Sequence, residues 1–396
     1  MKKIFNKIPL WIKIILIPVG LYILWNIIGI ILVSTKIVDK FPIGFNKVIA
    51  DSSYKSDKSK SDFDGPHIFY IDSIAIIKQV YKRDTITYSK IDTLSSNVKG
   101  QTIICNVNSK LSFETKIKDT LLIEPVVYTM PNKIIAISDI EGEFEVLYKF
   151  LLNNKVIDEK FNWTFGNGHL VLNGDFFDRG LHVTECLWLI YDLEQKAKLN
   201  GGKVHFILGN HEIMNMNGDI GYVANKYIEN TFLIKENYKN WYTTKTELGR
   251  WLQTKNIMEK IGEYLFVHGG ISMELSDLNL SIVEINNLAR PYYFKKKEIN
   301  ELQKEYILFD SETSPFWYRG IAKEVLSKKE IEMMLNKFNV TKMIIGHTIT
   351  EKVEYLYSER VIKIDTKHSE GISEGLLVEN NKEYRINIDG KKFRIE

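Results

Sequence analysis

The stretch HLVLNGDFFDRG, at residues 169–180, decides the fold class of this chain. Its first five residues form a short apolar run of the kind that becomes a buried strand. A glycine and three charged residues, Asp175, Asp178 and Arg179, follow this run closely. A strand commonly ends in one such residue where it meets a loop. These residues therefore indicate a functional site only if the neighbouring segments end in the same way.

The segments on either side repeat the pattern. KIIAIS (133–138) lies upstream and is followed by a segment with apolar residues at helical spacing. Downstream, an amphipathic stretch (182–199) ends at an Asn-Gly-Gly sequence, and VHFIL (204–208) comes next. Short apolar runs that alternate with helical stretches predict parallel strands joined by helical crossovers. The chain is therefore expected to be an α/β protein.

Five apolar runs each end in residues of the types that bind metal ions. Besides the three above, EYLFV (263–267) and KMIIG (342–346) behave in this way. In open α/β sheets, ligands gather outside the carboxyl ends of the strands, so these side chains should form one cluster. A mixed set of oxygen and nitrogen donors suits Mn, Fe or Zn. The predicted metal ligands are Asp139, Glu141, Asp175, Asn210, His268 and His347.

Four short motifs carry a resemblance to a known family. Gly174–Gly180 resembles the GDxxDRG motif of calcineurin-like metallophosphoesterases, and Gly209–Glu212 is similar to their GNHE motif. Val267–Gly270 and Gly346–Thr348 resemble their later histidine motifs. The DRG and GNHE residues resemble those of the phosphoprotein-phosphatase branch. The stretch SPFWYRG before Ile321 resembles bacterial Shewanella-like phosphatases. The resemblance covers about residues 133–378.

This resemblance implies a four-layer α/β/β/α sandwich that holds two divalent metal ions. Asp139 and Asp175 would bind the first metal, with Asp175 bridging to the second. Asn210, His268 and His347 would complete the second site. Two ions roughly 4 Å apart can share a hydroxide, lower its pKa and direct it at a phosphate ester. The implied reaction is phosphomonoester hydrolysis, with a phosphoprotein as the expected substrate.

The resemblance also implies roles for four further side chains. Arg179 would bind the phosphate through two hydrogen bonds, and Arg319 is a second phosphate contact. His211 would protonate the leaving oxygen, and Asp178 would hold its ring in the required tautomer. Arg290 is a weaker phosphate-binding candidate, because an ordinary surface arginine is the better explanation of it.

One position departs from the family pattern. The first motif is normally Asp-x-His, whereas this chain has Glu141 in place of the histidine. One hypothesis is that Glu141 binds the first metal, and a carboxylate there would favour Mn, Mg or Fe over Zn. We therefore expect Mn to be preferred. The opposing hypothesis is that Glu141 points away from a weak or empty first site, as in a pseudo-phosphatase that only binds its target.

The N-terminus predicts a membrane anchor within residues 1–35. Residues 14–33 contain no charged side chain and would span roughly 30 Å as a helix. A cleaved signal peptide and a buried core helix are the alternatives. The lysines that precede this segment favour a cytoplasmic N-terminus, so a single-pass membrane protein with an extracytoplasmic catalytic domain is expected. Those lysines are Lys2, Lys3, Lys7 and Lys13.

The rest of the chain divides by composition. Residues 36–62 are rich in Lys, Ser and Asp and predict a polar tether. Residues 63–130 alternate apolar and polar residues and predict a small β-rich module. Residues 131–396 form the predicted metallophosphoesterase domain. The two cysteines, Cys105 and Cys186, are expected to be buried thiols rather than a disulfide.

Composition sets limits on the partners. The formal net charge is +3, and lysines are scattered among acidic residues, so we expect no nucleic-acid partner. The expected partners are a phosphorylated substrate, either a phosphoprotein or a small phosphoester, and the membrane. A nucleotide or pyrophosphate hydrolase remains the alternative enzyme, because the residues that select the substrate lie in loops without a recognisable pattern.

Overall fold

The computed structural model of the chain describes residues 22–28, 31, 40–43, 47–50, 63–72, 74–83, 86–94, 98–295 and 298–396. Most of the predicted apolar span and of the polar tether lies outside these residues. Residues 22–28 are helical, and two short strands, β1 (Lys40–Ile43) and β2 (Lys47–Ala50), pair antiparallel. Within the described ranges, no helix has both the length and the apolar character needed to cross a bilayer.

The first of two large sheets contains the strands predicted around residues 133–208. Its six strands are β9 (Lys133–Ile137), β10 (His169–Asn173), β11 (Lys203–Ile207), β17 (Glu374–Glu379), β18 (Lys382–Asn387) and β19 (Lys392–Arg394). Their order is β11-β10-β9-β17-β18-β19, in which β9, β10 and β11 run parallel and β17 to β19 are antiparallel. The mixed α/β architecture expected from the sequence is confirmed.

The second large sheet comes from residues 127 to 363. Its six strands are β8 (Val127–Tyr128), β12 (Met258–Ile261), β13 (Tyr264–Val267), β14 (Lys342–Ile345), β15 (Glu354–Leu356) and β16 (Val361–Lys363). Their order is β15-β16-β14-β13-β12-β8. Strands β13, β14 and β16 are parallel, which brings their carboxyl ends to one edge.

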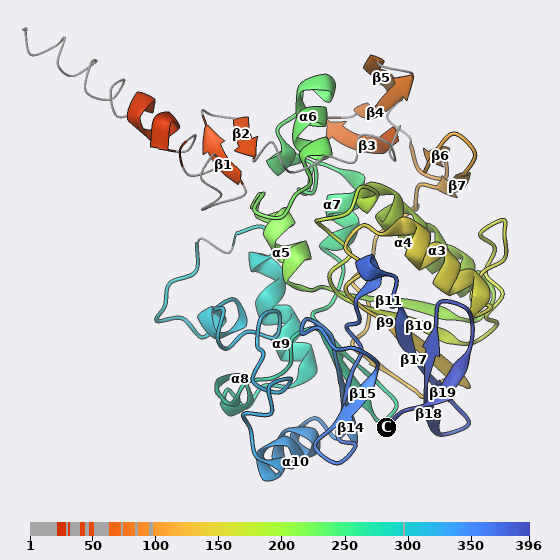
Figure 1. Ribbon diagram of the computed structural model, residues 1–396, viewed down its shortest axis with the longest axis vertical. Helices are drawn as coiled ribbons and strands as arrows, with labels where there is room; N and C mark the ends of the chain where they lie inside the picture. The colour runs from red at the N-terminus through yellow and green to blue at the C-terminus, as the bar shows by residue number, and fades with distance from the viewer. Residues whose placement is uncertain are drawn as a thin grey trace, which may run out of the picture.

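The two sheets pack face to face through a buried apolar layer. Ala136 and Val171 of the first sheet share this layer with Phe266, Ile344 and Ile362 of the second, and all five are fully buried. Neighbouring strand residues such as Ile345 point the other way, toward the helices. The helices of the outer layers are α3 (Phe144–Asn153), α4 (Val183–Leu199), α8 (Met273–Asp277), α9 (Ile282–Ala289) and α10 (Lys328–Lys337). The layers therefore run α/β/β/α (Figure 1).

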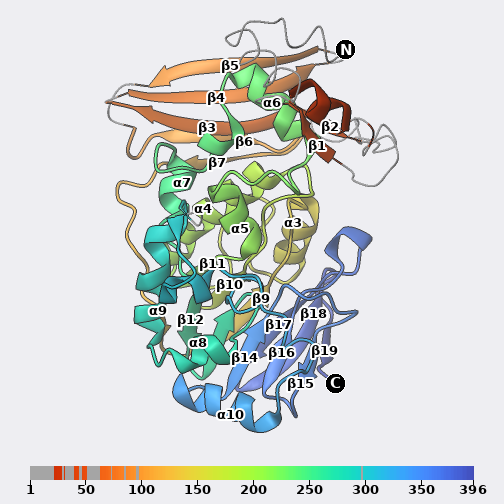
Figure 2. The same ribbon diagram turned by 90° about the vertical axis from the view of Figure 1, so that its left-hand side faces the viewer.

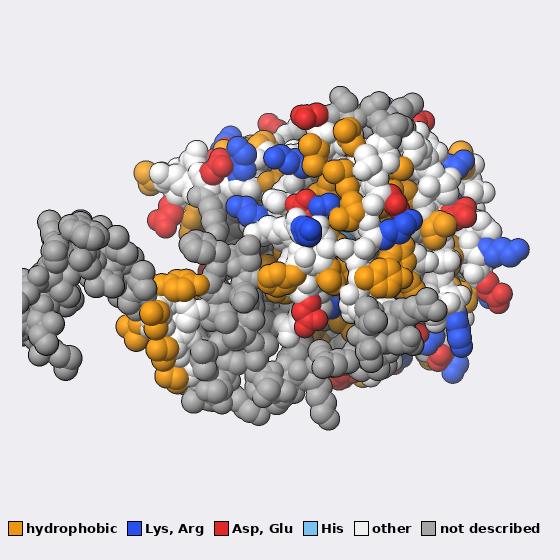
Figure 3. Space-filling model, turned by 90° about the horizontal axis from the view of Figure 1, so that it is seen from above, with side chains coloured by type: hydrophobic (Ala, Val, Ile, Leu, Met, Phe, Trp, Pro, Cys, Tyr) orange, Lys and Arg blue, Asp and Glu red, His pale blue; other side chains and the backbone are white. Residues whose placement is uncertain are grey.

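The predicted β-rich module forms a three-stranded sheet and a hairpin at one end of the molecule (Figure 2). Phe113 of the hairpin stacks on Phe144 of α3 with ring centroids 6.2 Å apart, and Trp188 of α4 donates a hydrogen bond to the carbonyl of Pro66. The module thus packs directly on the outer helices. Its strands are β3 (Phe63–Ile71), β4 (Ile74–Arg83), β5 (Ile86–Leu94), β6 (Thr102–Asn106) and β7 (Ser112–Lys116). Seen from this end, charged side chains of both signs lie between apolar ones (Figure 3).

Residues 222–251 are rich in aromatic side chains, and most of these pack into the core. Tyr227, Trp241 and Trp251 are fully buried, whereas Tyr222 is about half exposed. The helices here are α5 (Asn210–Met216), α6 (Asn225–Ile234) and α7 (Glu247–Leu252). The two cysteines are free and buried, as expected from the sequence.

Candidate active site

The five apolar runs identified in the sequence end at one edge of the two sheets. Asp139 and Asp175 follow β9 and β10, and Asn210 begins α5 just after β11. His268 comes directly after β13, and His347 follows β14. All five side chains are at least nine-tenths buried. The fold therefore brings residues that are up to 208 positions apart in the sequence into one cluster.

The backbone at this edge adopts a conformation that side chains usually avoid. Asp139, Asp175, Asp178 and His347 all have positive φ, between 56° and 70°. Such conformations cost about 1–3 kcal/mol each and persist where the surrounding structure enforces them, which is typical of functional sites. Gly174 permits the close approach, since a Cβ there would lie 2.5 Å from the Nδ1 atom of His268.

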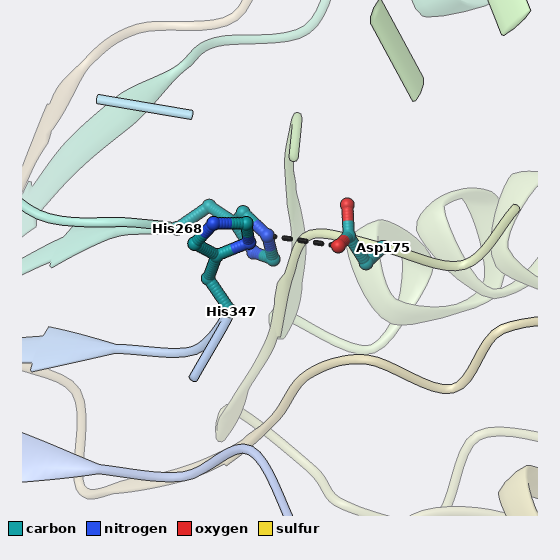
Figure 4. A group of neighbouring side chains, drawn as sticks. All are labelled: Asp175, His268 and His347. Carbon is teal, nitrogen blue, oxygen red and sulfur yellow. Dashed lines mark ion pairs between the residues drawn. The ribbon is translucent and has the colours of Figure 1, made fainter. Parts of the chain in front are cut away.

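One group of potential ligand atoms comprises Asp175, His268 and His347, with all three atoms within 4.8 Å of one another (Figure 4). His268 Nε2 lies 3.0 Å from Asp175 Oδ2, and its Nδ1 donates to the carbonyl of Asn173 at 2.8 Å. The side chain of Asn210 approaches His268 Nε2 to 3.2 Å. These are the residues that the sequence assigned to the second metal.

The carboxylates around His268 favour a positive charge within this cluster. Burial opposes a charge on His268, but the carboxylates of Asp175 and Asp139 outweigh it and raise its pKa to about 10. His347 lies in the same cluster, and burial together with the positive His268 lowers its pKa to about 2. A proton on His268 thus balances carboxylates that a metal ion would otherwise balance, and the donor set fits a divalent ion.

Asp139 occupies the other side of the cluster. Its Oδ2 accepts a hydrogen bond from the backbone N–H of His347 at 3.1 Å. Burial raises the pKa of Asp139 to about 6, with His268 opposing this shift and the charge of Asp175 adding to it. Asp139 and Asp175 are therefore a pair of repelling carboxylates, as expected where a cation bridges two acids.

Glu141 lies within reach of the cluster but has a partner of its own. Its carboxylate is within 4.8 Å of ligand atoms of Asp175 and His211, and it also forms an ion pair with Arg179. This ion pair gives Glu141 a third role, besides the two hypotheses drawn from the sequence. In that role Glu141 holds the predicted phosphate-binding arginine beside the cluster.

His211 and Asp178 form a hydrogen-bonded pair next to the cluster. His211 Nδ1 lies 2.5 Å from Asp178 Oδ2, while its Nε2 faces Asp175 Oδ2 at 3.8 Å. Burial lowers the pKa of His211, but the charge of Asp175 and the contact with Asp178 raise this pKa by more. The net shift is therefore upward. Asn215 donates to Asp178 at 3.0 Å and accepts from the Tyr238 hydroxyl at 2.5 Å, so the pair is held from behind.

The predicted phosphate-binding arginines line a cavity of about 500 Å³ that opens onto the cluster. The side chain of Arg179 is half exposed and lies over the Tyr222 ring, 5.3 Å from its centroid. Arg319 donates to the carbonyl of His347 and to the hydroxyl of Thr348, at 2.5 and 3.1 Å. The guanidinium groups of Arg179 and Arg319 therefore line a cavity that is rich in metal-binding side chains.

Residues 132–351 match the calcineurin-like phosphoesterase family. The chain belongs to this family. The chain is also similar to a cold-active protein-tyrosine phosphatase from a psychrophilic Shewanella species, with 36% identity and a TM-score of 0.77. That alignment covers 85% of this chain and all of the solved one. Members of the family are hydrolases of phosphate esters that depend on two metal ions.

Two curated relatives extend the comparison. Shewanella-like protein phosphatase 1 of Plasmodium berghei is 31% identical over 228 residues, which cover 55% of this chain and 61% of the relative. Shewanella-like protein phosphatase 2 of Arabidopsis thaliana is 25% identical over 300 residues, covering 63% and 74%. The chain thus spans less than two thirds of the Plasmodium protein.

Arg290 is not part of this phosphoesterase site. It is buried and donates to the carbonyls of Gln253 and Lys255 and to the side chain of Asn256. The weaker phosphate-binding prediction for Arg290 is therefore wrong, and so is the surface-arginine alternative. The guanidinium of Arg290 donates hydrogen bonds to buried carbonyl groups at a helix terminus. The neighbouring sequence does not predict this role.

Four residues of the phosphoesterase site are not among the predicted catalytic or metal-binding residues. Glu212 accepts hydrogen bonds from the backbone N–H groups of Gly209, Asp175 and Phe176 and so joins two ligand-bearing loops. Glu212 is the last residue of the GNHE motif, so the motif could have predicted that this residue belongs to the site. Asn215 and Tyr222 contact residues distant in the sequence, and Asp365 lines the cavity; none of the three belongs to a motif that the sequence analysis used.

The histidines outside the four motifs mostly make structural contacts. His205 lies 2.6 Å from Glu259 and 2.9 Å from His169, in a buried group away from the cluster. His67 lies 3.2 Å from Asp64 in the β-rich module. His368 is an exception in position, because it lines the active-site cavity.

Proposed function

We propose that this chain is a metal-dependent phosphatase that removes phosphate from phosphorylated proteins. The observation that carries the proposal is the His211–Asp178 pair beside the Asp175–His268–His347 cluster. A protein that only binds phosphate has no need for a positioned proton donor. The intact pair therefore favours catalysis over the pseudo-phosphatase alternative.

The residues fit two divalent metal ions. Asp139 and Asp175 would hold the first ion, and Asp175, Asn210, His268 and His347 would hold the second. When bound, the two ions supply a hydroxide nucleophile at neutral pH and neutralise the phosphate oxygens. The excess of carboxylates over imidazoles on the first side favours Mn, Mg or Fe over Zn, and we propose Mn.

The chain's own residues orient the phosphate and supply the proton. Arg179 and Arg319 bind the phosphate oxygens at the mouth of the cavity, and a planar guanidinium matches two oxygens at once. His211 gives its Nε2 proton to the leaving oxygen. Asp178 accepts from Nδ1 and keeps the ring oriented so that Nε2 carries the proton toward the substrate.

The substrate class rests on the relatives. The Shewanella structure is described as a protein-tyrosine phosphatase, and the Plasmodium and Arabidopsis relatives are named protein phosphatases. A cavity of about 500 Å³ is large enough to take a phosphorylated side chain with part of its surroundings. Phosphotyrosine, phosphoserine and phosphothreonine peptides are therefore the first substrates to compare.

The purified full-length chain, kept in detergent, should hydrolyse p-nitrophenyl phosphate and phosphopeptides when Mn²⁺ is added and lose this activity in chelator. Asp175→Asn removes the carboxylate shared by both metal positions and should abolish turnover. The exposed residue Glu145 provides a matched control, since Glu145→Gln removes one acidic charge away from the site. Strong preference for nucleotides over phosphopeptides in this panel would contradict the protein-phosphatase assignment.

The effect on kcat of removing the proton donor should depend on the leaving group. His211→Asn should lower kcat on a phosphoserine peptide by about 10²- to 10⁴-fold, the usual contribution of a general acid. The loss on p-nitrophenyl phosphate should be much smaller, because p-nitrophenolate leaves without a proton. Asp178→Asn should show the same pattern to a lesser degree, since it removes the charge that orients His211.

Equal losses on both substrates would argue against a proton-donor role for His211. Circular dichroism and thermal unfolding of each variant, compared with the natural chain, separate this result from misfolding.

We also propose that residues 14–33 anchor the chain in a membrane, with the catalytic domain on the extracytoplasmic side. The proposal rests on the uncharged stretch, and the described helical residues Tyr22, Ile23, Leu24 and Trp25 are each about half exposed. Placing arginine at Leu24 and Ile27 should release the chain from membranes, because each charge costs about 2.5–3.5 kcal/mol at a helix centre. Recovery of the natural chain in the supernatant after carbonate extraction would contradict anchoring, and a C-terminal reporter tests the orientation.

A further inference from the structure

The aromatic ring of Tyr222 contacts two of the side chains that the proposed reaction uses. Its centroid lies 5.1 Å from that of the His211 ring, in an edge-to-face arrangement, and 5.3 Å from the guanidinium carbon of Arg179. His211 and Arg179 both line the active-site cavity. Tyr222 nevertheless keeps 49% of its surface exposed. The ring therefore lies beside the cavity with room for a further contact.

The backbone around Tyr222 is tied to the loop that carries Arg179. The N–H of Arg179 donates a hydrogen bond to the carbonyl of Tyr222 at 3.0 Å. Further along the chain, on α6, the hydroxyl of Tyr227 accepts a hydrogen bond from the N–H of Val183 at 2.8 Å. Tyr227 is buried, so this second link is shielded from water. The two links hold Tyr222 in a defined position relative to the phosphate-binding arginine.

The contact with His211 places Tyr222 on the leaving-group side of the reaction. In the proposed mechanism the Nε2 proton of His211 goes to the leaving oxygen, which must come within hydrogen-bond distance of that atom. Because the two ring centroids are only 5.1 Å apart, the group attached to this oxygen comes within reach of the Tyr222 ring. In phosphotyrosine that group is an aromatic ring, whereas in phosphoserine it is a methylene next to the peptide backbone.

We propose that Tyr222 is a specificity-determining residue that contacts the aromatic ring of a phosphotyrosine substrate. Aromatic rings attract one another beyond the apolar area that they bury, in offset or edge-to-face arrangements. A serine or threonine leaving group offers no such ring. Tyr222 therefore selects aryl phosphates, whereas Arg179 and His211 act on every phosphate ester. This inference rests on the proposed phosphatase activity and names the substrate that the site prefers.

The test compares the full-length chain in detergent, with Mn²⁺ added, on phosphotyrosine and phosphoserine peptides of otherwise identical sequence. Tyr222→Leu keeps an apolar side chain but removes the ring. Its kcat/KM on the phosphotyrosine peptide should fall by roughly three- to ten-fold, the contribution of one aromatic pair, mainly through a higher KM. Its kcat/KM on the phosphoserine peptide should change little. Tyr222→Phe keeps the ring and should behave like the natural chain.

Tyr88→Leu is the matched control, because Tyr88 is 46% exposed on β5 of the β-rich module, away from the site. Neither activity should change in this variant, and thermal unfolding of every variant shows whether the fold is intact. A second measurement needs no substitution. Phenylphosphonate should inhibit the natural chain more tightly than cyclohexylphosphonate, which has a similar size but no aromatic ring.

Since Tyr222 also lies against Arg179, a positioning role is the rival explanation. An equal loss on both peptides in Tyr222→Leu would overturn the inference in favour of that role. An unchanged kcat/KM on the phosphotyrosine peptide, or equal inhibition by the two phosphonates, would also overturn it. In each of these cases the natural chain still hydrolyses phosphopeptides, so the proposed function stands. No turnover of either peptide by the natural chain would overturn the proposed function, and this inference with it.

Discussion

Repulsion among buried carboxylates is the constraint on which the rest of this site depends. Asp139, Asp175 and Asp365 are all buried acids that line the same cavity at the ends of strands from the two sheets. Without a cation the cluster is balanced in part by a proton on His268, whose pKa rises to about 10. The fold thus keeps together acids that only positive charge can stabilise, and the same charge is what a phosphate ester needs.

The two-sheet architecture provides the rigidity that such crowding requires. The ligands sit on turns directly after buried parallel strands, and several of these turns have positive φ. Glu212 ties the Asp175 loop to the start of α5 through three backbone N–H groups. Asn215 and Tyr238 hold Asp178 from behind in the same way. Strain at the site is therefore compensated by hydrogen bonds one layer further out.

Much of this arrangement could be predicted from the sequence, because the deciding signals are local. Each apolar run that ends in a ligand can be recognised over six to ten residues, and the rule for parallel strands places the run ends at one edge. The positions of Arg290 and Tyr222 could not be predicted, since their contacts depend on neighbours distant in the sequence. The pairing of Glu141 with Arg179 was missed for the same reason, although the departure at Glu141 was visible.

The central claim is that these strand ends bind two metal ions, and diffraction from crystals soaked in Mn²⁺ tests it most directly. The account predicts two anomalous peaks roughly 4 Å apart that share the Asp175 carboxylate. One should lie against Asp139 and the other against His268 and His347. A single peak, or none, with His268 still hydrogen-bonded to Asp175, would contradict the account.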